Sequence, residues 1–194
     1  MLIRMLDPLR HQCLIYAGAA SSHLSEVATT LIQRLNANQR CLYLNSPSMV
    51  AGMRSQLSSQ GLSTQSQLDR GALLLSSDQR HLVNRKFDVD RMLCLLDDAM
   101  NRALADGFAG LWAAGDMTWE FGSEENLNKL LEYERRLEAF MQNNDAIGGV
   151  CLYHRDTLPA HAIETAFLTH PAMYVSATWS QLNARYSPQL AGNA

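Results

Sequence analysis

The sequence predicts an α/β fold, a three-layer domain with a mostly parallel sheet and helices on both faces. The main observation is that short apolar runs alternate with amphipathic helical stretches along the 194 residues. A second is the strong 3.6-residue periodicity between these runs, clearest over 89–103. A third is the lack of an internal repeat or a Gly/Ser linker. Such alternation is typical of a parallel sheet with right-handed crossovers.

The expected elements follow from hydrophobic pattern and capping residues. Strands are predicted at 11–17, 40–45, 72–76, 108–114, 146–153 and 172–176. Helices are predicted after an N-cap at Ser22, from Pro47 to about Gly61, after an N-cap at Asp88, and over 123–143 and 159–169. Residues 62–71 are polar and are assigned no helix or strand, and 77–87 is expected to be a loop.

Length and composition predict one domain over 1–194, with its core at about 10–178 and a loosely held tail at 187–194. A chain of this size buries enough apolar surface to fold without disulfides. The net charge of −3 and pI near 6.0 argue against a nucleic-acid-binding face. We expect buried, reduced cysteines, no C-x-x-C motif, no cysteine beside a zinc-binding histidine pair, and no metal site.

We expect a cytoplasmic protein. Charged residues and Pro8 interrupt the first ten positions, which is unlike a signal peptide. No apolar run reaches the roughly 20 residues of a membrane span.

Candidate ligand-binding residues follow from a rule of open parallel sheets, whose ligands bind at the carboxyl ends of the strands. That rule, with the pattern of polar residues, selects Tyr16, Gly18, Ser22, Asn45, Asp116, Trp119 and Tyr153. The turn at 16–22 would place helix N–H groups where a phosphate could bind. It lacks the G-x-x-x-x-G-K-[ST] motif, so an ordinary strand–helix turn capped by serine is favoured.

Two further positions leave alternatives open. Asp116 follows a buried strand, where an aspartate either holds magnesium or caps the next helix, and Trp119 either stacks on a ligand or packs in the core. Glu134 falls on the apolar stripe of 123–143 and therefore needs a partner, a polar cavity or a raised pKa. We predict that this stripe consists of Leu127, Leu130, Leu131, Leu137 and Met141.

His11 and Cys13 begin the first strand in the pattern H-x-C-x-x-Y. Strand alternation predicts that they share one face while Tyr16 lies on the other. His11 is at the amino end of the strand, away from the expected ligand edge, so we assign both residues structural roles.

Several stretches together resemble a known family. In order they are H-x-C-x-x-Y, "RCLYL", "FDVDRML", "GDMTWE", "LLEYERRL", "VCLYHRDTLP" and "THP". Over about 10–178 they are similar to the MEDS domain, the methanogen/methylotroph sensory domain of dichloromethane-responsive regulators. The resemblance implies a RecA/KaiC-like domain with a degenerate phosphate loop and a role in sensing small hydrocarbon-derived molecules.

The family pattern falls on His11, Cys13, Tyr16, Asp116, Trp119, Glu132, Glu134 and Tyr153. His154 departs from it, because an acidic residue is expected there, and Val89 stands where proline is frequent. Family members often carry a helix-turn-helix or a kinase, and we see no such output domain in this sequence.

We therefore expect a non-catalytic sensory or regulatory domain with no cofactor. It would bind a small molecule or a partner protein at the carboxyl edge of the sheet. It would signal through a kinase, regulator or transcription factor, with no direct contact to nucleic acid or membrane, and homo-oligomers are possible. One alternative is a nucleotide-binding protein or weak ATPase, with Asp116 near magnesium and Glu134 or Glu120 positioning water. The other is a pure interaction adaptor.

Overall fold

The centre of the structure, a computed structural model that describes residues 10–121 and 123–188, is a seven-stranded sheet. Its strand order is β3-β2-β6-β7-β1-β8-β9. Neighbouring strands run parallel except for the last pair, β8 and β9, which is antiparallel. The strands are β1 His11–Tyr16, β2 Arg40–Leu44, β3 Leu73–Ser76, β6 Leu111–Asp116, β7 Ile147–His154, β8 Ala172–Ser176 and β9 Trp179–Leu182.

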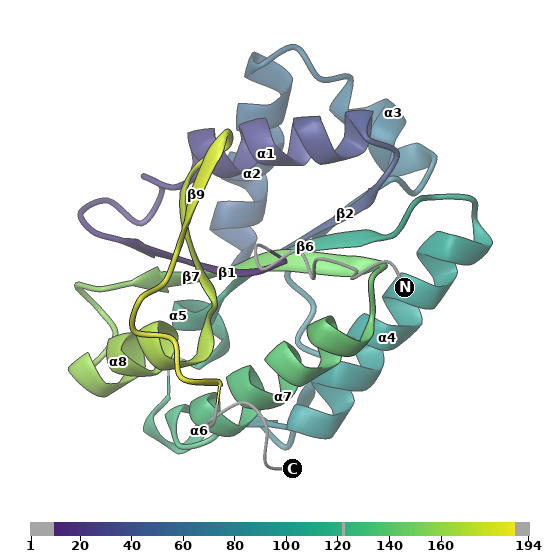
Figure 1. Cartoon of the computed structure of the whole chain (residues 1–194). Coiled ribbons are helices and arrows are strands. Elements are labelled where there is room, and N and C mark those ends of the chain that lie inside the picture. The colour runs from purple at the N-terminus through teal and green to yellow at the C-terminus, as the bar shows by residue number, and fades with distance from the viewer. Residues whose placement is uncertain (1–9, 122, 189–194) are drawn as a thin grey trace.

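Helices cover both faces of the sheet (Figure 1). One face carries α1 Leu24–Asn36, α2 Pro47–Ser59 and α3 Thr64–Asp69. The other carries α4 Val89–Ala105, α5 Met117–Glu120, α6 Glu124–Leu127, α7 Leu130–Asn143 and α8 Ala160–Thr169. The predicted three-layer α/β architecture with a mostly parallel sheet is therefore confirmed. Its RecA/KaiC-like character stays a prediction.

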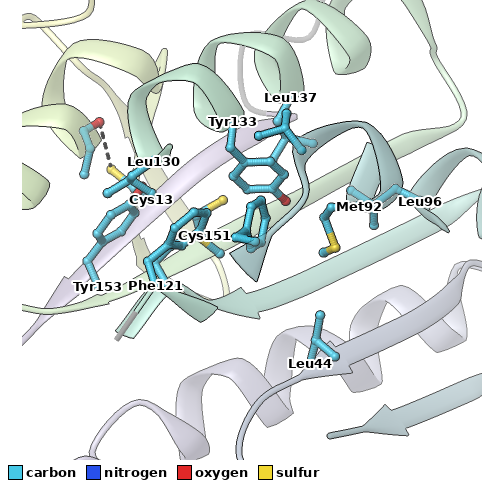
Figure 2. Packing of buried hydrophobic residues seen from close by; sticks show 14 of the residues in the cluster. Cys13, Leu44, Met92, Leu96, Phe121, Leu130, Tyr133, Leu137, Cys151 and Tyr153 are labelled. Carbon is cyan, nitrogen blue, oxygen red and sulfur yellow. Dashed lines mark hydrogen bonds between the residues drawn. The ribbon is translucent and has the colours of Figure 1, made fainter. Parts of the chain in front are cut away.

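Two separate hydrophobic clusters form, because successive side chains of a strand point to opposite faces. On the α1 face, Val27 and Leu31 pack against Leu152 of the sheet. On the α7 face, Met92 and Leu137 belong to a cluster that includes Cys151 and Tyr153 (Figure 2). All eight residues of β7 are buried, since this strand lies at the centre of the sheet.

Close packing at the centre of the sheet requires glycine. A Cβ atom on Gly149 of β7 would lie 2.1 Å from the carbonyl oxygen of Ala113 on β6. Gly110, just before β6, has a φ of +153°, and a Cβ there would lie 2.2 Å from the carbonyl oxygen of Ala146. These two positions let β6 and β7 pair along Leu111–Asp116.

The predicted loop at 77–87 is wrong in part, because it contains a small antiparallel hairpin. Its strands are β4 Leu82–Val83 and β5 Lys86–Phe87. Asn84 and Arg85 connect them with positive φ angles, as a two-residue hairpin turn requires. The sequence did not indicate this turn, because Arg85 occupies its second position, where glycine is usual. The strand β9 was also missed, and it extends the sheet beyond the predicted limit of 178.

The predicted helix over 123–143 is broken into α6 and α7. Asn126 accepts a 2.7 Å hydrogen bond from the Phe87 backbone, and Lys129 donates to the Phe87 carbonyl at 2.7 Å. These side chains tie the break to the hairpin. The buried stripe of α7 contains Leu130, Tyr133, Glu134, Leu137, Glu138 and Met141. Leu131 was wrongly placed on it and is 40% exposed.

Two smaller expectations concern capping and the tail. Ser22 is not the N-cap of α1. The helix begins after His23, and the Ser22 hydroxyl instead donates to the Ala17 carbonyl at 3.3 Å. Asp88 does cap α4 and accepts from the Arg91 backbone at 2.9 Å. Most of the predicted tail, 189–194, lies outside the described residues.

Candidate functional site

Asp116 is the centre of a hydrogen-bonded group at the carboxyl edge of the sheet, which we call the edge network (Tyr16, His23, Tyr43, Asn45 and Asp116). One carboxylate oxygen accepts from the Tyr16 hydroxyl at 3.2 Å and from the Asn45 amide at 3.1 Å. The other accepts from the Trp119 backbone N–H at 2.9 Å and so caps α5. The side-chain amide of Asn45 also donates to the Tyr43 hydroxyl at 2.9 Å.

This arrangement leaves Asp116 little capacity for a further ligand. A carboxylate has about four lone-pair sites, and protein donors occupy three of them here. The residue is also 4% exposed. Of the two roles left open by the sequence, capping and bracing describe this aspartate better than magnesium coordination.

The histidines beside the edge network also make protein contacts. His23 Nε2 lies 2.9 Å from the Tyr43 hydroxyl, and burial lowers the His23 pKa. The His154 ring stacks on Tyr16 with centroids 4.9 Å apart, and its Nε2 lies 2.9 Å from the Gly18 carbonyl oxygen. Gly18 and Ser22 themselves lie in an exposed turn. His154 therefore braces this turn from the position where an acidic residue was expected.

A second polar group, the buried cluster (His11, Glu134, Cys151, Tyr153 and His170), lies on the opposite face of the sheet. Glu134 of α7 is 0% exposed and projects toward β1 and β7. One of its oxygens, Oε1, accepts a short hydrogen bond from the Tyr153 hydroxyl. The other, Oε2, lies 3.4 Å from His11 Nε2, 3.4 Å from His170 Nε2 and 3.7 Å from Cys151 Sγ. The predicted need of Glu134 for partners is thus met by Tyr153, Cys151 and His11, whereas His170 Nε2 makes no hydrogen bond to it.

The outward-facing nitrogens of both histidines have acceptors. His11 Nδ1 lies 2.8 Å from Glu138 Oε2, and His170 Nδ1 lies 2.9 Å from the Ala166 carbonyl oxygen. Glu138 is held in turn by Gln142 at 2.6 Å and by the Tyr186 hydroxyl at 2.9 Å. Each ring is therefore fixed with its Nε2 atom directed toward Glu134.

Burial and neighbouring charges shift the pKa values of His11, His170 and Cys151 in different directions. Burial opposes charge on His11, but the carboxylates of Glu134 and Glu138 outweigh it and raise the His11 pKa to about 9. Burial and the neighbouring His11 charge lower the His170 pKa to about 4. Burial raises the pKa of the Cys151 thiol well above its ordinary value, and the Glu134 carboxylate adds to this. Without another cation, the cluster holds its positive charge on His11, opposite the Glu134 carboxylate, and keeps Cys151 and His170 neutral.

The structure therefore divides the predicted site residues between two faces of the sheet. Tyr16, Asn45 and Asp116 meet in the edge network, whereas Glu134 and Tyr153 meet in the buried cluster with His11. Trp119 packs at the margin of the apolar cluster on the α7 face. Glu132 is exposed and pairs with Arg136 at 3.4 Å. Asp116 and Glu134, which the ATPase hypothesis places together, lie on opposite faces.

His11 and Cys13 share a face, as strand alternation predicts, and both pack on the side of α7 and α8. No cysteine was expected beside a zinc-binding histidine pair; in the fold, Cys151 Sγ lies 3.7 Å from His11 Nε2 and within 4.8 Å of a His170 ring nitrogen. His170 and Glu138 were missed as site residues. The "THP" stretch contains His170, but only the fold shows that it meets the amino end of β1.

Two hollows lie on the α7 face, and the smaller one has Cys151 of the buried cluster in its lining. A groove of about 550 Å³ runs between α4 and the strands β2 and β3. An inner cavity of about 30 Å³ has an almost entirely apolar lining that includes Cys151 and Glu120. Burial raises the Glu120 pKa, although contact with the buried His81 opposes this shift. The two spaces share four lining residues, Leu42, Leu44, Met92 and Leu96.

The fold and these features define a class: a three-layer α/β domain with a groove along α4 and a separate buried polar cluster. Comparison with known families gives the finer assignment. The family model described as the MEthanogen/methylotroph, DcmR Sensory domain (MEDS) matches residues 10–171. The chain belongs to this family of sensory domains. None of the curated proteins compared with the chain matches it.

The lengths and compositions of the helices bear on whether any of them could span a membrane. Across the described ranges, 10–121 and 123–188, none of the helices has the length and apolar character needed to cross a membrane.

Proposed function

We propose that this sensory domain binds a small, weakly polar organic molecule in the groove between α4 and the sheet, and signals through a partner protein. The observation that carries the proposal is the pair of adjoining hollows described above. The 550 Å³ groove has the volume of a small-molecule site. Only Leu42, Leu44, Met92 and Leu96 border both it and the inner cavity.

The chemistry of the lining supports an apolar ligand. Leu74 of β3 lines the groove and is 37% exposed, so a ligand there would remove apolar surface from water. Charged side chains such as Arg40, Asp78 and Arg102 also line it and would orient a polar substituent. This location differs from the predicted one at the carboxyl edge, where the edge-network side chains already bond to one another.

A route for the signal follows from α4, which forms one wall of the groove. Asp90 near its start pairs with Arg136 of α7 at 2.5 Å, and the aspartate is 79% exposed. Exposed pairs of this kind contribute little stability, so this ion pair would not by itself hold α4 in one position against α7. A ligand that prefers one position of α4 would change the surface shared by α4 and α7, where a partner would bind.

Binding is tested by calorimetry and thermal shift with benzene, dichloromethane and short-chain alcohols as probes. At a ligand concentration of 100 times Kd, the expected stabilisation is about 2.7 kcal/mol. Leu96→Trp enlarges a side chain that lines both the groove and the cavity, and it should weaken binding about tenfold or more. Leu93→Trp, on the same helix but away from both linings, should leave binding unchanged. The proposal fails if no probe binds at millimolar concentration, or if Leu96→Trp binds as wild type does.

A further inference from the structure

The buried cluster contains four potential metal ligands that converge on one point. They are His11 of β1, Glu134 of α7, Cys151 of β7 and His170, which lies between α8 and β8. One donor atom from each lies within 4.8 Å of all the others, and all four side chains are buried. We propose that these residues bind a divalent transition-metal ion of the zinc class.

Four of the six separations between donor atoms are close to those of a four-coordinate site. Glu134 Oε2 is 3.4 Å from each histidine Nε2, and Cys151 Sγ is 3.7 Å from both Glu134 Oε2 and His11 Nε2. Zinc bonds of roughly 2.0–2.1 Å to nitrogen or oxygen give tetrahedral edges of about 3.4 Å, and a bond of about 2.3 Å to sulfur lengthens its edges to about 3.6 Å. The remaining separations are at most 4.8 Å, so the ion would draw these side chains inward to complete the coordination shell.

The histidine rings are already oriented for coordination. Each Nδ1 has an acceptor, Glu138 Oε2 at 2.8 Å for His11 and the Ala166 carbonyl at 2.9 Å for His170. Metal-bound histidines almost always donate their other ring N–H in this way, which leaves the Nε2 lone pair for the ion. The Tyr153 hydroxyl likewise fixes Glu134 through its second oxygen.

An independent observation is that His170 Nε2 has no hydrogen-bond partner among the described residues, although its side chain is 0% exposed. Buried polar atoms without a partner are uncommon and costly. This nitrogen points at the centre of the cluster, 3.4 Å from Glu134 Oε2. A metal ion at that centre would satisfy it.

The donor set indicates the class of ion. Two imidazoles, one thiol and one carboxylate suit Zn²⁺ and neighbouring first-row ions, whereas Mg²⁺ and Ca²⁺ prefer oxygen ligands alone. Binding requires Cys151 to lose its thiol proton and His11 to be neutral, so protons leave as the ion enters. With four protein ligands the site would be structural or regulatory, and Cys151 connects it to the inner cavity that it also lines.

The test uses the full chain without a histidine tag, stripped with chelator and titrated with Co²⁺. A Cys94→Ser background removes the exposed thiol. We expect one Co²⁺ per chain, intense visible bands of tetrahedral Co²⁺ and a near-ultraviolet thiolate-to-cobalt band, all lost when Zn²⁺ is added. Cys151→Ala should lose the thiolate band. The matched control Cys41→Ala, a buried cysteine on the opposite face, should keep it.

If Cys151→Ala does not fold, a second variant that leaves all four metal ligands in place tests the same site. Glu138→Gln removes only the charge behind His11 and should weaken Co²⁺ binding about 10–100-fold with the spectrum unchanged. The proposal is overturned if the folded wild-type chain binds no Co²⁺ or Zn²⁺. It is also overturned if Cys151→Ala retains the thiolate band, or if Glu138→Gln binds as tightly as wild type.

Discussion

Replacing Asp116 with alanine tests whether this residue braces the fold or waits for a ligand. A carboxylate kept for magnesium or another ligand normally destabilises the empty protein, so its removal would be neutral or stabilising. In this structure both oxygens accept hydrogen bonds from the protein. We therefore expect Asp116→Ala to lower the free energy of unfolding substantially.

The magnitude follows from the three hydrogen bonds. Loss of the cap on the Trp119 N–H costs about 1 kcal/mol. The Tyr16 hydroxyl and the Asn45 amide each lose a charged, buried acceptor, at about 1.5 kcal/mol apiece. The sum of about 4 kcal/mol is a large part of the 5–15 kcal/mol typical of a domain. It corresponds to a fall in Tm of about 12 °C for a chain of this length.

The assay is urea unfolding followed by circular dichroism and tryptophan fluorescence, with coincident transitions as the check on two-state behaviour. Asp88→Ala is the matched control, because Asp88 also caps a helix with a 2.9 Å bond but does so at an exposed site. It should cost only about 1 kcal/mol. The bracing role is refuted if Asp116→Ala costs no more than Asp88→Ala.

Three further predictions concern other parts of the fold. Gly149→Ala should lower the free energy of unfolding, measured in urea, by at least about 3 kcal/mol, because the added Cβ would clash with the Ala113 carbonyl. The control Gly61→Ala should lower it by only about 1 kcal/mol, because its Cβ would enter open space and only the φ of +86° is unfavourable. Burial lowers the pKa of His23 in the folded chain, so the unfolded chain binds this proton at a higher pH than the folded chain does. The free energy of unfolding should therefore fall as the pH drops below 6.5, by at most about 1.4 kcal/mol per pH unit. His23→Gln should remove that part of the slope, and an unchanged pH profile would contradict the assignment. A thiol reagent should label only Cys94 in the native chain and all four cysteines after denaturation; fast labelling of a second thiol would show that the sheet opens.

Much of the fold was predictable because the hydrophobic periodicity of strands and helices is a local property of the sequence. The runs that became β1, β2 and β7 are largely apolar, and α4 has a capping aspartate and a regular stripe. The failures occur where side chains from elsewhere intervene. Asn126 and Lys129 hold the hairpin backbone and interrupt the helix, which no local pattern reveals.

The candidate site was only partly predictable. Helical periodicity placed Glu134 on the buried stripe and indicated that it needs partners, but it gave no means of naming them. His11 and His170 come together because β1 and β8 are adjacent in the sheet, and that adjacency is a property of topology. Asp116 and Tyr153 were predicted to share one site because both lie near the carboxyl ends of their strands. Their side chains point to opposite faces of the sheet, and Glu134 of α7 meets only Tyr153.

The alternation of side chains along β7 limits how relatives of this domain can differ in length. Cys151 and Tyr153 face the buried cluster, whereas His154 faces the turn after β1. Inserting or deleting a single residue within this strand would exchange the two sets, and so break both the buried cluster and the contact of His154 with the Gly18 carbonyl. Length changes should therefore collect in connections such as 177–178 or the segment around 77–81, and any relative with an altered β7 should have lost the buried cluster and this His154 contact together.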